Sequence, residues 1–212
     1  MNAILFDMDG VLTNTEPVIN AAAIRGLHEY GVDSKPEDFE PFVGMGEDRY
    51  IGGVAEKYGV PYKLEMKARV YEIYPDIPPD MIEQFAGVHE LLTAIREHKL
   101  ELGLATSADR IKMEANLKAI DVPLDWFGAI VTGEDIEHKK PDPEIYLVCA
   151  GKLGVEPEHC CVVEDAINGV QAAKAAGMRC IGVTTSFDGE KLSAAGADHV
   201  CAGLPEIPEI LW

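Results

Sequence analysis

The sequence lacks a long apolar run, and none of its segments reaches the roughly 18 to 20 uninterrupted apolar residues that a membrane-spanning helix needs. It also lacks internal repeats and low-complexity tracts. The first strand-like segment begins almost at Met1, which leaves no room for a signal or transit peptide. We therefore expect a cytoplasmic chain with no membrane partner.

Basic residues are scarce, since 18 Lys and Arg stand against 37 Asp and Glu, for a net charge of −19. An acidic surface repels phosphate backbones, so we expect no nucleic-acid partner. The same repulsion acts on any small anionic ligand, and local cations or a metal would have to reverse the sign at its site. Alternatively, most of the acidity only keeps the chain in solution.

Cysteine is present in an odd number, five, without any C-x-x-C spacing. This pattern suggests neither a disulfide framework nor a zinc site, and it fits a reducing compartment. The length of 212 residues and the apolar fraction of 47% suit one large domain, or one domain that carries an insertion.

Short apolar runs alternate with helical patterns along most of the chain. Strands alternating with helices predict an α/β fold, a Rossmann-like parallel sheet with helices on both faces. The runs are continuously apolar, as in strands that are covered on both sides. The expected strands are 3–6, 100–105, 129–131, 160–163, 180–183 and 199–201, and the expected helices are 87–98, 109–119, 143–153, 167–176 and 189–195.

The segment 14–85 breaks this rhythm, with helical patterns near 17–30, 47–58 and 62–74 and no convincing strand. We interpret it as a helical insertion placed after the first strand. Residues 1–13 and 86–212 would then form the α/β core.

Polar side chains follow four of the expected strands. In an open parallel sheet, ligands bind at the carboxyl ends of the strands, so these side chains should converge. Clustered carboxylates need a neutralising cation, and Mg²⁺ is the usual hard cation where phosphate is also present. The set comprises Asp7, Asp9, Thr106, Ser107, Lys140, Glu164 and Asp165.

Each part of this set has a chemical use. An aspartate can attack phosphorus, a second carboxyl two residues later can move the proton, and a lysine and hydroxyls can hold phosphate oxygens. Each member alone also has a simpler interpretation. A D-x-D pair often follows a strand, Thr106-Ser107 can precede a helix cap, Lys140 can be a solvated lysine, and Glu164-Asp165 can cap the next helix.

At these residues the chain resembles the haloacid-dehalogenase-like hydrolase superfamily, in the group that contains beta-phosphoglucomutase and many sugar-phosphate phosphatases. The resemblance spans nearly the whole chain, with the motifs in the right order. The matching segments are ILFDMDGVL at 4–12, LATS at 104–107, KPDPEIY at 140–146, and VEDAINGV at 163–170 followed by AAKAAG at 172–177.

The resemblance implies a magnesium-dependent phosphatase that acts through an aspartyl-phosphate on a small phosphomonoester, such as a sugar phosphate. It also implies that 14–85 is a cap that closes over the site and selects the substrate. By resemblance, Asp7 is the nucleophile and a metal ligand, and Asp9 is the general acid and base and binds the metal through its backbone carbonyl. The resemblance also implies that Thr106, Ser107 and Lys140 bind phosphate. Asp165, with Glu164, would complete the Mg²⁺ site.

Two departures favour hydrolysis over the mutase reaction of the same group. Ile19 stands where the mutases carry a histidine, and Asp109 and Arg110 stand where they carry a lysine and an asparagine. A hexose-phosphate mutase and, from another class, a non-catalytic binding or regulatory protein remain the alternatives.

In the insertion, the segment VGMGEDR at 43–49 resembles the family's cap loop that faces the site. It makes Arg49 a candidate for binding substrate, with an intrahelical ion pair as the equal alternative. A phosphonate-cleaving role for Lys57 conflicts with the first motif. The sequence does not name the substrate, and it does not decide between a monomer and a dimer.

Overall fold

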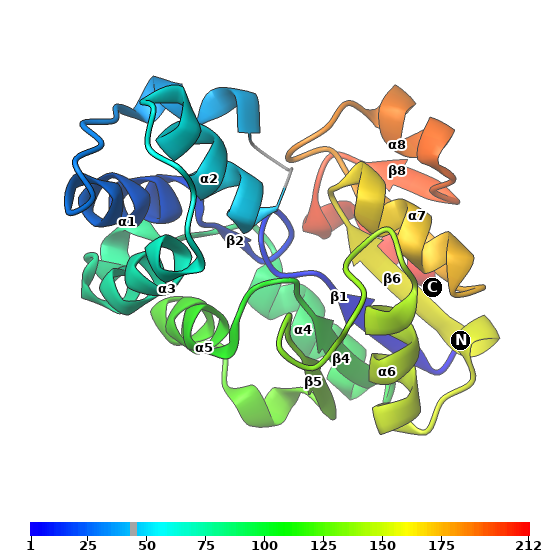
Figure 1. The fold of residues 1–212 in the computed structure, drawn as a ribbon. Helices are drawn as coiled ribbons and strands as arrows, with labels where there is room; N and C mark the ends of the chain where they lie inside the picture. The colour runs from blue at the N-terminus through cyan, green and yellow to red at the C-terminus, as the bar shows by residue number, and fades with distance from the viewer. Residues whose placement is uncertain (43–45) are drawn as a thin grey trace. The chain divides into compact units, whose positions relative to one another are not determined.

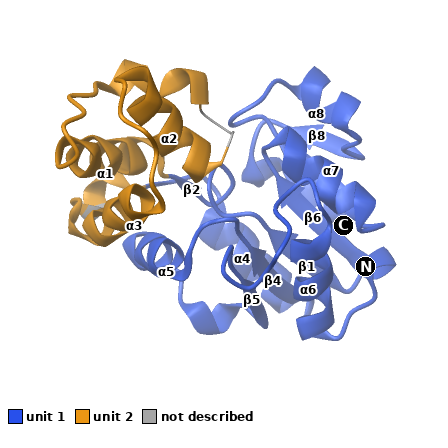
Figure 2. Cartoon of the chain, in the orientation of Figure 1, with its two compact units in different colours: residues 1–14, 83–212 blue, residues 15–82 orange. Residues whose placement is uncertain are grey.

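The structure is a computed structural model that describes residues 1–42 and 46–212. The chain divides into two compact units, which are coloured separately in Figure 2. Unit 1 comprises Met1–Asn14 and Glu83–Trp212, and unit 2 comprises Thr15–Ile82. Each unit is described by itself below.

Unit 1 is built on a parallel sheet of six strands, in the order β5-β4-β1-β6-β7-β8 (Figure 1). The central strand β1 pairs with β4 on one side and β6 on the other. The predicted α/β fold is therefore confirmed. The strands are β1 (Ala3–Phe6), β4 (Glu101–Ala105), β5 (Ala129–Val131), β6 (Cys160–Glu164), β7 (Arg179–Val183) and β8 (His199–Cys201).

Helices cover both faces of this sheet. Helices α6, α7 and α8 lie on one face, and α4 packs against β4 on the other (Figure 1). Leu5 and Ala105 of the sheet belong to one apolar cluster with residues of α6, α7 and α8. All four residues of β1 and all five of β6 are buried, which explains why β1 and the first four residues of β6 are apolar. The helices are α4 (Val88–Glu97), α5 (Arg110–Ala119), α6 (Glu144–Leu153), α7 (Ile167–Ala175), α8 (Gly189–Ala195) and α9 (Pro208–Leu211).

Helix ends follow the glycine signals. Gly177 and Gly196, with φ of 75° and 110°, lie just beyond α7 and α8. Glycine adopts this left-handed backbone without the clash that a Cβ would cause, so these helices stop at the predicted positions.

Unit 2 is helical and contains α1 (Glu16–His28), α2 (Glu47–Lys57) and α3 (Leu64–Ile73). Helices α1 and α3 pack closely at Gly26, where the lack of a Cβ leaves room for Val70. A Cβ added at Gly26 would lie 2.7 Å from Val70 Cγ2. The three predicted helices of the insertion are confirmed within a few residues.

The expectation of no strand in 14–85 is wrong at both ends. β2 (Thr13–Asn14) pairs antiparallel with β3 (Glu83–Gln84). Two-residue strands are too short to show an alternating pattern in sequence. The short 3-10 helices are also additional to the prediction, at Pro36–Asp38, Glu40–Phe42, Tyr74–Asp76, Pro79–Met81, Leu124–Trp126, Pro157–His159 and Leu204–Glu206.

Among the described residues, no helix combines the length and the apolar character that crossing a bilayer requires. The five cysteines are free and buried, where they pack as small apolar side chains.

Candidate active site

The chain arrives at the candidate site from the carboxyl ends of three adjacent strands. Asp7 follows β1 directly, Thr106 follows β4, and Glu164 is the last residue of β6. Strand register brings them together, because Phe6 lies opposite both Leu104 and Val163. The chain leaves β1 for β4 and β5 on one side and returns to β6 on the other, and such a switch point is where open parallel sheets bind ligands.

Lys140 joins these residues from the loop after β5. Its Nζ lies 2.6 Å from Asp7 Oδ1 and 2.7 Å from Glu164 Oε1. The Lys140 side chain is only 9% exposed, and both carboxylates are buried. A lysine in this position is a counter-ion shared by two buried acids, and the solvated alternative for Lys140 does not hold.

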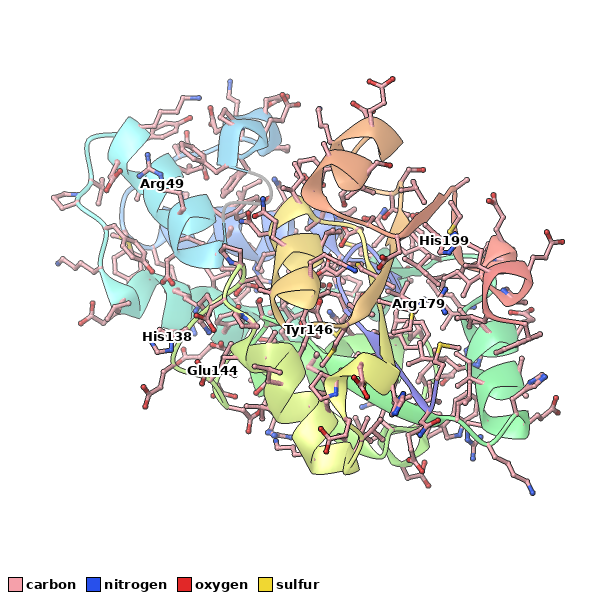
Figure 3. All side chains as sticks on the ribbon, turned by 90° about the vertical axis from the view of Figure 1, so that its right-hand side faces the viewer. Arg49, His138, Glu144, Tyr146, Arg179 and His199 are labelled. Carbon is pink, nitrogen blue, oxygen red and sulfur yellow. The ribbon has the colours of Figure 1, made fainter. Side chains whose placement is uncertain are left out.

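Glu164 is fixed on all sides. Its Oε1 accepts a hydrogen bond from the Tyr146 hydroxyl at 2.9 Å, and its Oε2 accepts the backbone N–H groups of Asp165 and Ala166. Tyr146 is a buried residue of α6 (Figure 3). A Cβ at Gly169 would lie 1.6 Å from Glu164 Oε1, so only glycine leaves room for the carboxylate. Glu164 therefore also fixes the turn that leads into α7.

Asp165 packs against the loop that follows β1. A Cβ at Gly10 would lie 1.9 Å from Asp165 Oδ2, and Gly10 has a φ of 84°. The carboxylate also takes a hydrogen bond from Ser186, and the hydroxyl of Thr185 donates to the Gly10 carbonyl. The segment after β7 thus supports this side of the site, which the sequence analysis missed.

Burial and mutual repulsion disfavour the charged forms of these acids. Burial raises the pKa of Asp7 from 3.8 to about 7, since the opposing effect of Lys140 is partly offset by Glu164. Burial, Glu164 and Asp7 together raise the pKa of Asp165 well above its usual range. Burial lowers the pKa of Lys140, but Asp7 and Glu164 outweigh it and raise that pKa, so the ammonium stays charged.

Asp9 turns toward α5. Its Oδ2 lies 2.9 Å from Lys112 Nζ, and its Oδ1 lies 3.3 Å from Asn116 Nδ2. The sequence analysis did not single out Lys112 or Asn116. The i, i+4 spacing of two polar residues in a helix directly after a site strand was the signal that could have found them.

The two predicted hydroxyl residues differ in burial. Thr106 is buried, and its Oγ1 accepts the backbone N–H of Ala108 at 3.1 Å. Ser107 is exposed. Their roles toward phosphate stay predictions.

Arg49 lies on α2 of unit 2 (Figure 3). Its guanidinium pairs with Glu56 at 2.8 Å and lies over the Phe42 ring, so the intrahelical alternative is present in the structure. The residues 43–45 of the resembling loop lie outside the described residues. A substrate role for Arg49 stays a prediction.

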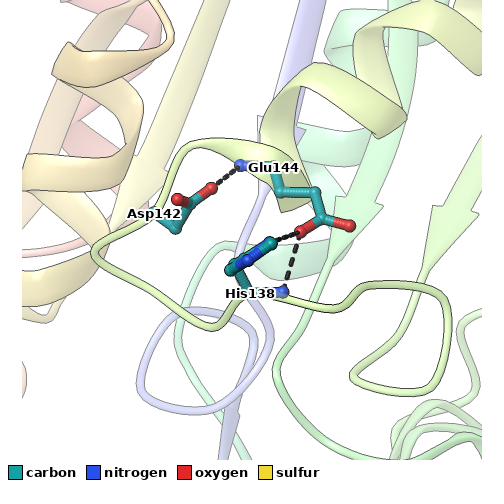
Figure 4. Close-up of side chains that lie close together, drawn as sticks. All are labelled: His138, Asp142 and Glu144. Atoms are coloured by element: carbon teal, nitrogen blue, oxygen red, sulfur yellow. Dashed lines mark hydrogen bonds and ion pairs between the residues drawn. The ribbon is translucent and has the colours of Figure 1, made fainter.

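His138, Asp142 and Glu144 form an exposed cluster beside Lys140 in sequence, shown in Figure 4. The Glu144 carboxylate accepts hydrogen bonds from the backbone N–H groups of Glu137 and His138 and is hydrogen-bonded to the His138 ring at Nδ1. The Asp142 carboxylate accepts a hydrogen bond from the Glu144 backbone N–H. Since the Glu144 carboxylate already binds these groups, the cluster serves to fix the loop that carries Lys140.

The donor set at the strand ends fits a divalent cation by charge. When all three are ionised, Asp7, Glu164 and Asp165 supply three carboxylates against the single ammonium of Lys140, which would leave two negative charges for a cation to match. Side chains alone do not supply a complete set of metal ligands. In the described chain, Asp7, Asp9 and Asp165 do not form a group of three whose ligand oxygens all lie within 4.8 Å of one another. A main-chain carbonyl or water would have to complete the shell, as is usual for Mg²⁺.

Comparison with known proteins agrees with this geometry. Residues 4–183 match the family model described as haloacid dehalogenase-like hydrolase. The chain is 37% identical over 211 residues to a phosphorylated carbohydrates phosphatase of Thermotoga maritima, covering 93% of this chain and 92% of that protein. It also resembles the structure of CbbY from Rhodobacter sphaeroides in complex with phosphate, at 26% identity and a TM-score of 0.83, covering 98% and 100% of the two chains.

A further relative is the Arabidopsis thaliana protein SUPPRESSOR OF QUENCHING 1, chloroplastic, 44% identical over 204 residues. The match covers 94% of this chain but only 19% of that protein. The family match, with the phosphatase relative of equal length, assigns the chain as an enzyme of the phosphatase group of the haloacid dehalogenase-like hydrolase family.

Proposed function

We propose that this enzyme is a magnesium-dependent phosphatase that hydrolyses a phosphorylated carbohydrate through a phosphorylated Asp7. The observation that carries the proposal is the buried Asp7 carboxyl group directly after β1, with Lys140 Nζ 2.6 Å away and shared with Glu164. A buried acid that lacks full compensation is the arrangement expected of a reacting group with a metal partner.

The residues divide the reaction between them. Asp7 attacks phosphorus as its bond to the leaving oxygen breaks, and the Asp9 carboxyl gives its proton to that oxygen. Water then attacks the aspartyl-phosphate and passes its proton to Asp9, which releases inorganic phosphate and restores Asp7. Lys140, with Thr106 and Ser107, would hold the phosphate oxygens.

Asp7, Asp165 and the Asp9 carbonyl are the groups that would hold Mg²⁺, with Glu164 as a closer or outer ligand. When bound, the cation withdraws negative charge from the transferring phosphoryl group.

Two points support the substrate class and the direction of the reaction. The Thermotoga maritima relative is named for phosphorylated carbohydrates. At the position where the mutases carry a histidine, this chain has Ile19, which is buried and has no group that could transfer a proton. We propose hydrolysis over isomerisation on this basis, with unit 2 as the cap that selects the substrate and the cytoplasm as the compartment.

The test is release of inorganic phosphate from a panel of hexose, hexitol and pentose phosphates with Mg²⁺. We expect turnover that EDTA abolishes and Mg²⁺ restores, and no turnover in Asp7→Asn. Asp125→Asn, at an exposed acid of the same unit, is the matched control and should keep full activity. Failure of the wild-type enzyme across the panel, or unchanged activity in Asp7→Asn, would refute the proposal.

Isomerisation has a distinct signature. A mutase would convert one hexose phosphate into another and would need a bisphosphate primer. Phosphate release without any isomer in the products would exclude that alternative.

A further inference from the structure

The carboxylate of Asp9 is held by two side chains from a single helix. Lys112 Nζ donates to Oδ2 at 2.9 Å and Asn116 Nδ2 approaches Oδ1 at 3.3 Å, so each carboxylate oxygen receives a donor. Lys112 and Asn116 are four residues apart in α5, and this spacing puts both on one face of the helix.

The burial of these donors shows that the contact is built into the fold. The Lys112 side chain is 5% exposed, whereas that of Asp9 is 31% exposed. Asn116 is fully buried and also contacts Met8 Sδ at 3.8 Å. Burying a lysine is costly unless its charge is matched, and Asp9 supplies one such matching charge.

Two donors on one rigid helix fix both the position and the rotation of the carboxylate. One oxygen is held by a charge-assisted hydrogen bond, which is shorter and stronger than a neutral one. The partly exposed Asp9 would otherwise sample several rotamers at the end of its loop.

We propose that Lys112 and Asn116 are positioning residues that hold the Asp9 carboxyl in line for proton transfer to and from the substrate oxygen. The inference rests on the proposed function, because it assigns Asp9 the proton-transfer step there. Neither residue is asked to touch phosphate; each acts through Asp9.

A positioning role predicts a dependence on the leaving group. A sugar alkoxide needs a proton as its bond to phosphorus breaks, whereas 4-nitrophenolate leaves without one. Lys112→Met keeps the length of the apolar stem and removes the donor. We expect its kcat on the best carbohydrate phosphate of the panel to fall about 10²-fold, within the usual range for proton-transfer catalysis, with KM nearly unchanged.

With 4-nitrophenyl phosphate, formation of the aspartyl-phosphate should proceed near the wild-type rate in Lys112→Met, while its hydrolysis slows. Rapid-quench measurement should then show a burst of one nitrophenolate per enzyme. Asn116→Leu, which preserves volume, should show the same pattern with a smaller loss, and Lys112→Arg should recover part of the rate. Lys118→Met, at an exposed position of the same helix, is the matched control and should behave as wild type.

The outcomes separate this inference from the function beneath it. Absence of turnover by the wild-type enzyme would overturn both. If Asp9→Asn shows the leaving-group dependence and folded Lys112→Met and Asn116→Leu do not, the inference is wrong and the proposed function stands. A rise in KM without a fall in kcat in Lys112→Met would mean that Lys112 binds substrate directly, and this result would also overturn the inference.

Discussion

The same substitution, glycine to alanine, should have opposite effects on two helices of unit 1. Gly151 lies in α6, is exposed, and would place its new Cβ in open space with no atom within 4 Å. Gly169 lies in α7 and is buried, and its new Cβ would lie 1.6 Å from Glu164 Oε1. Alanine in a helix interior is better than glycine by about 0.5–1 kcal/mol, and Gly151→Ala should gain roughly this amount.

At Gly169 the gain is outweighed by what Glu164 loses. The carboxylate must move by more than 1 Å to admit the Cβ, and it cannot do so and keep its contacts with Lys140 at 2.7 Å and the Tyr146 hydroxyl at 2.9 Å. Hydrogen bonds to buried charged groups contribute about 1.5–3 kcal/mol each. Partial loss of two of them, less the helix gain, gives a net destabilisation of about 2–4 kcal/mol for Gly169→Ala.

Urea unfolding of both variants, followed by circular dichroism, measures the two changes, and phosphatase assays on the same samples measure the site. Gly169→Ala should also lose most of its activity, because Lys140 loses one of the two acids that hold it. If Gly169→Ala proves as stable as Gly151→Ala and stays active, then Glu164 is not fixed by its contacts and our account of the site is wrong.

Three further predictions concern contacts and pKa values in unit 1, with one control residue, Tyr58, in unit 2. Tyr146→Phe removes the donor to Glu164 and should cost about 1.5–3 kcal/mol of unfolding free energy, while Tyr58→Phe at an exposed hydrogen bond should change it much less. Burial raises the pKa of Asp7 to about 7, so the folded metal-free protein keeps a proton that the unfolded chain releases from about pH 4 upward. The free energy of unfolding should therefore decrease as the pH rises from about 4 to about 7. Chemical denaturation in EDTA checks this, since Asp7→Asn should flatten that part of the profile. Burial raises the pKa of Cys149 to about 12, so an aromatic disulfide reagent should label it slowly in the native protein and rapidly in urea.

The sequence was most informative where a pattern is local. The run at 160–163 predicted a strand that is observed at Cys160–Glu164, because a strand covered on both faces is largely apolar, here up to the acid that ends it at the site. Helix ends at Gly177 and Gly196 were predicted because a left-handed backbone selects glycine. The two-residue pair of Thr13–Asn14 with Glu83–Gln84 carries no such local pattern and was missed.

The site depends on contacts that sequence spacing does not encode. Asp7 and Lys140 are 133 residues apart and meet at 2.6 Å only because β1 and β4 are neighbours and the loop after β5 returns to their edge. Topology and family resemblance supplied this convergence in the prediction. Lys112 could not be distinguished from a solvated lysine, since its orientation depends on how α5 packs against the loop after β1.

The charges of the site oppose folding, and this is the strongest physical argument that they are retained for chemistry. Burial is the largest of the causes that raise the pKa of Asp7 and Asp165, so ionising them inside the protein costs free energy. Apolar residues of similar volume in place of a buried ion pair are often neutral or more stable by about 1–4 kcal/mol. A fold under selection for stability alone would therefore replace Asp7, Lys140 and Glu164 with apolar side chains. Ionised carboxylates at this place would be an advantage only when a divalent cation and an anionic substrate enter together, since the cation then offsets the repulsion that a chain of net charge −19 exerts on phosphate.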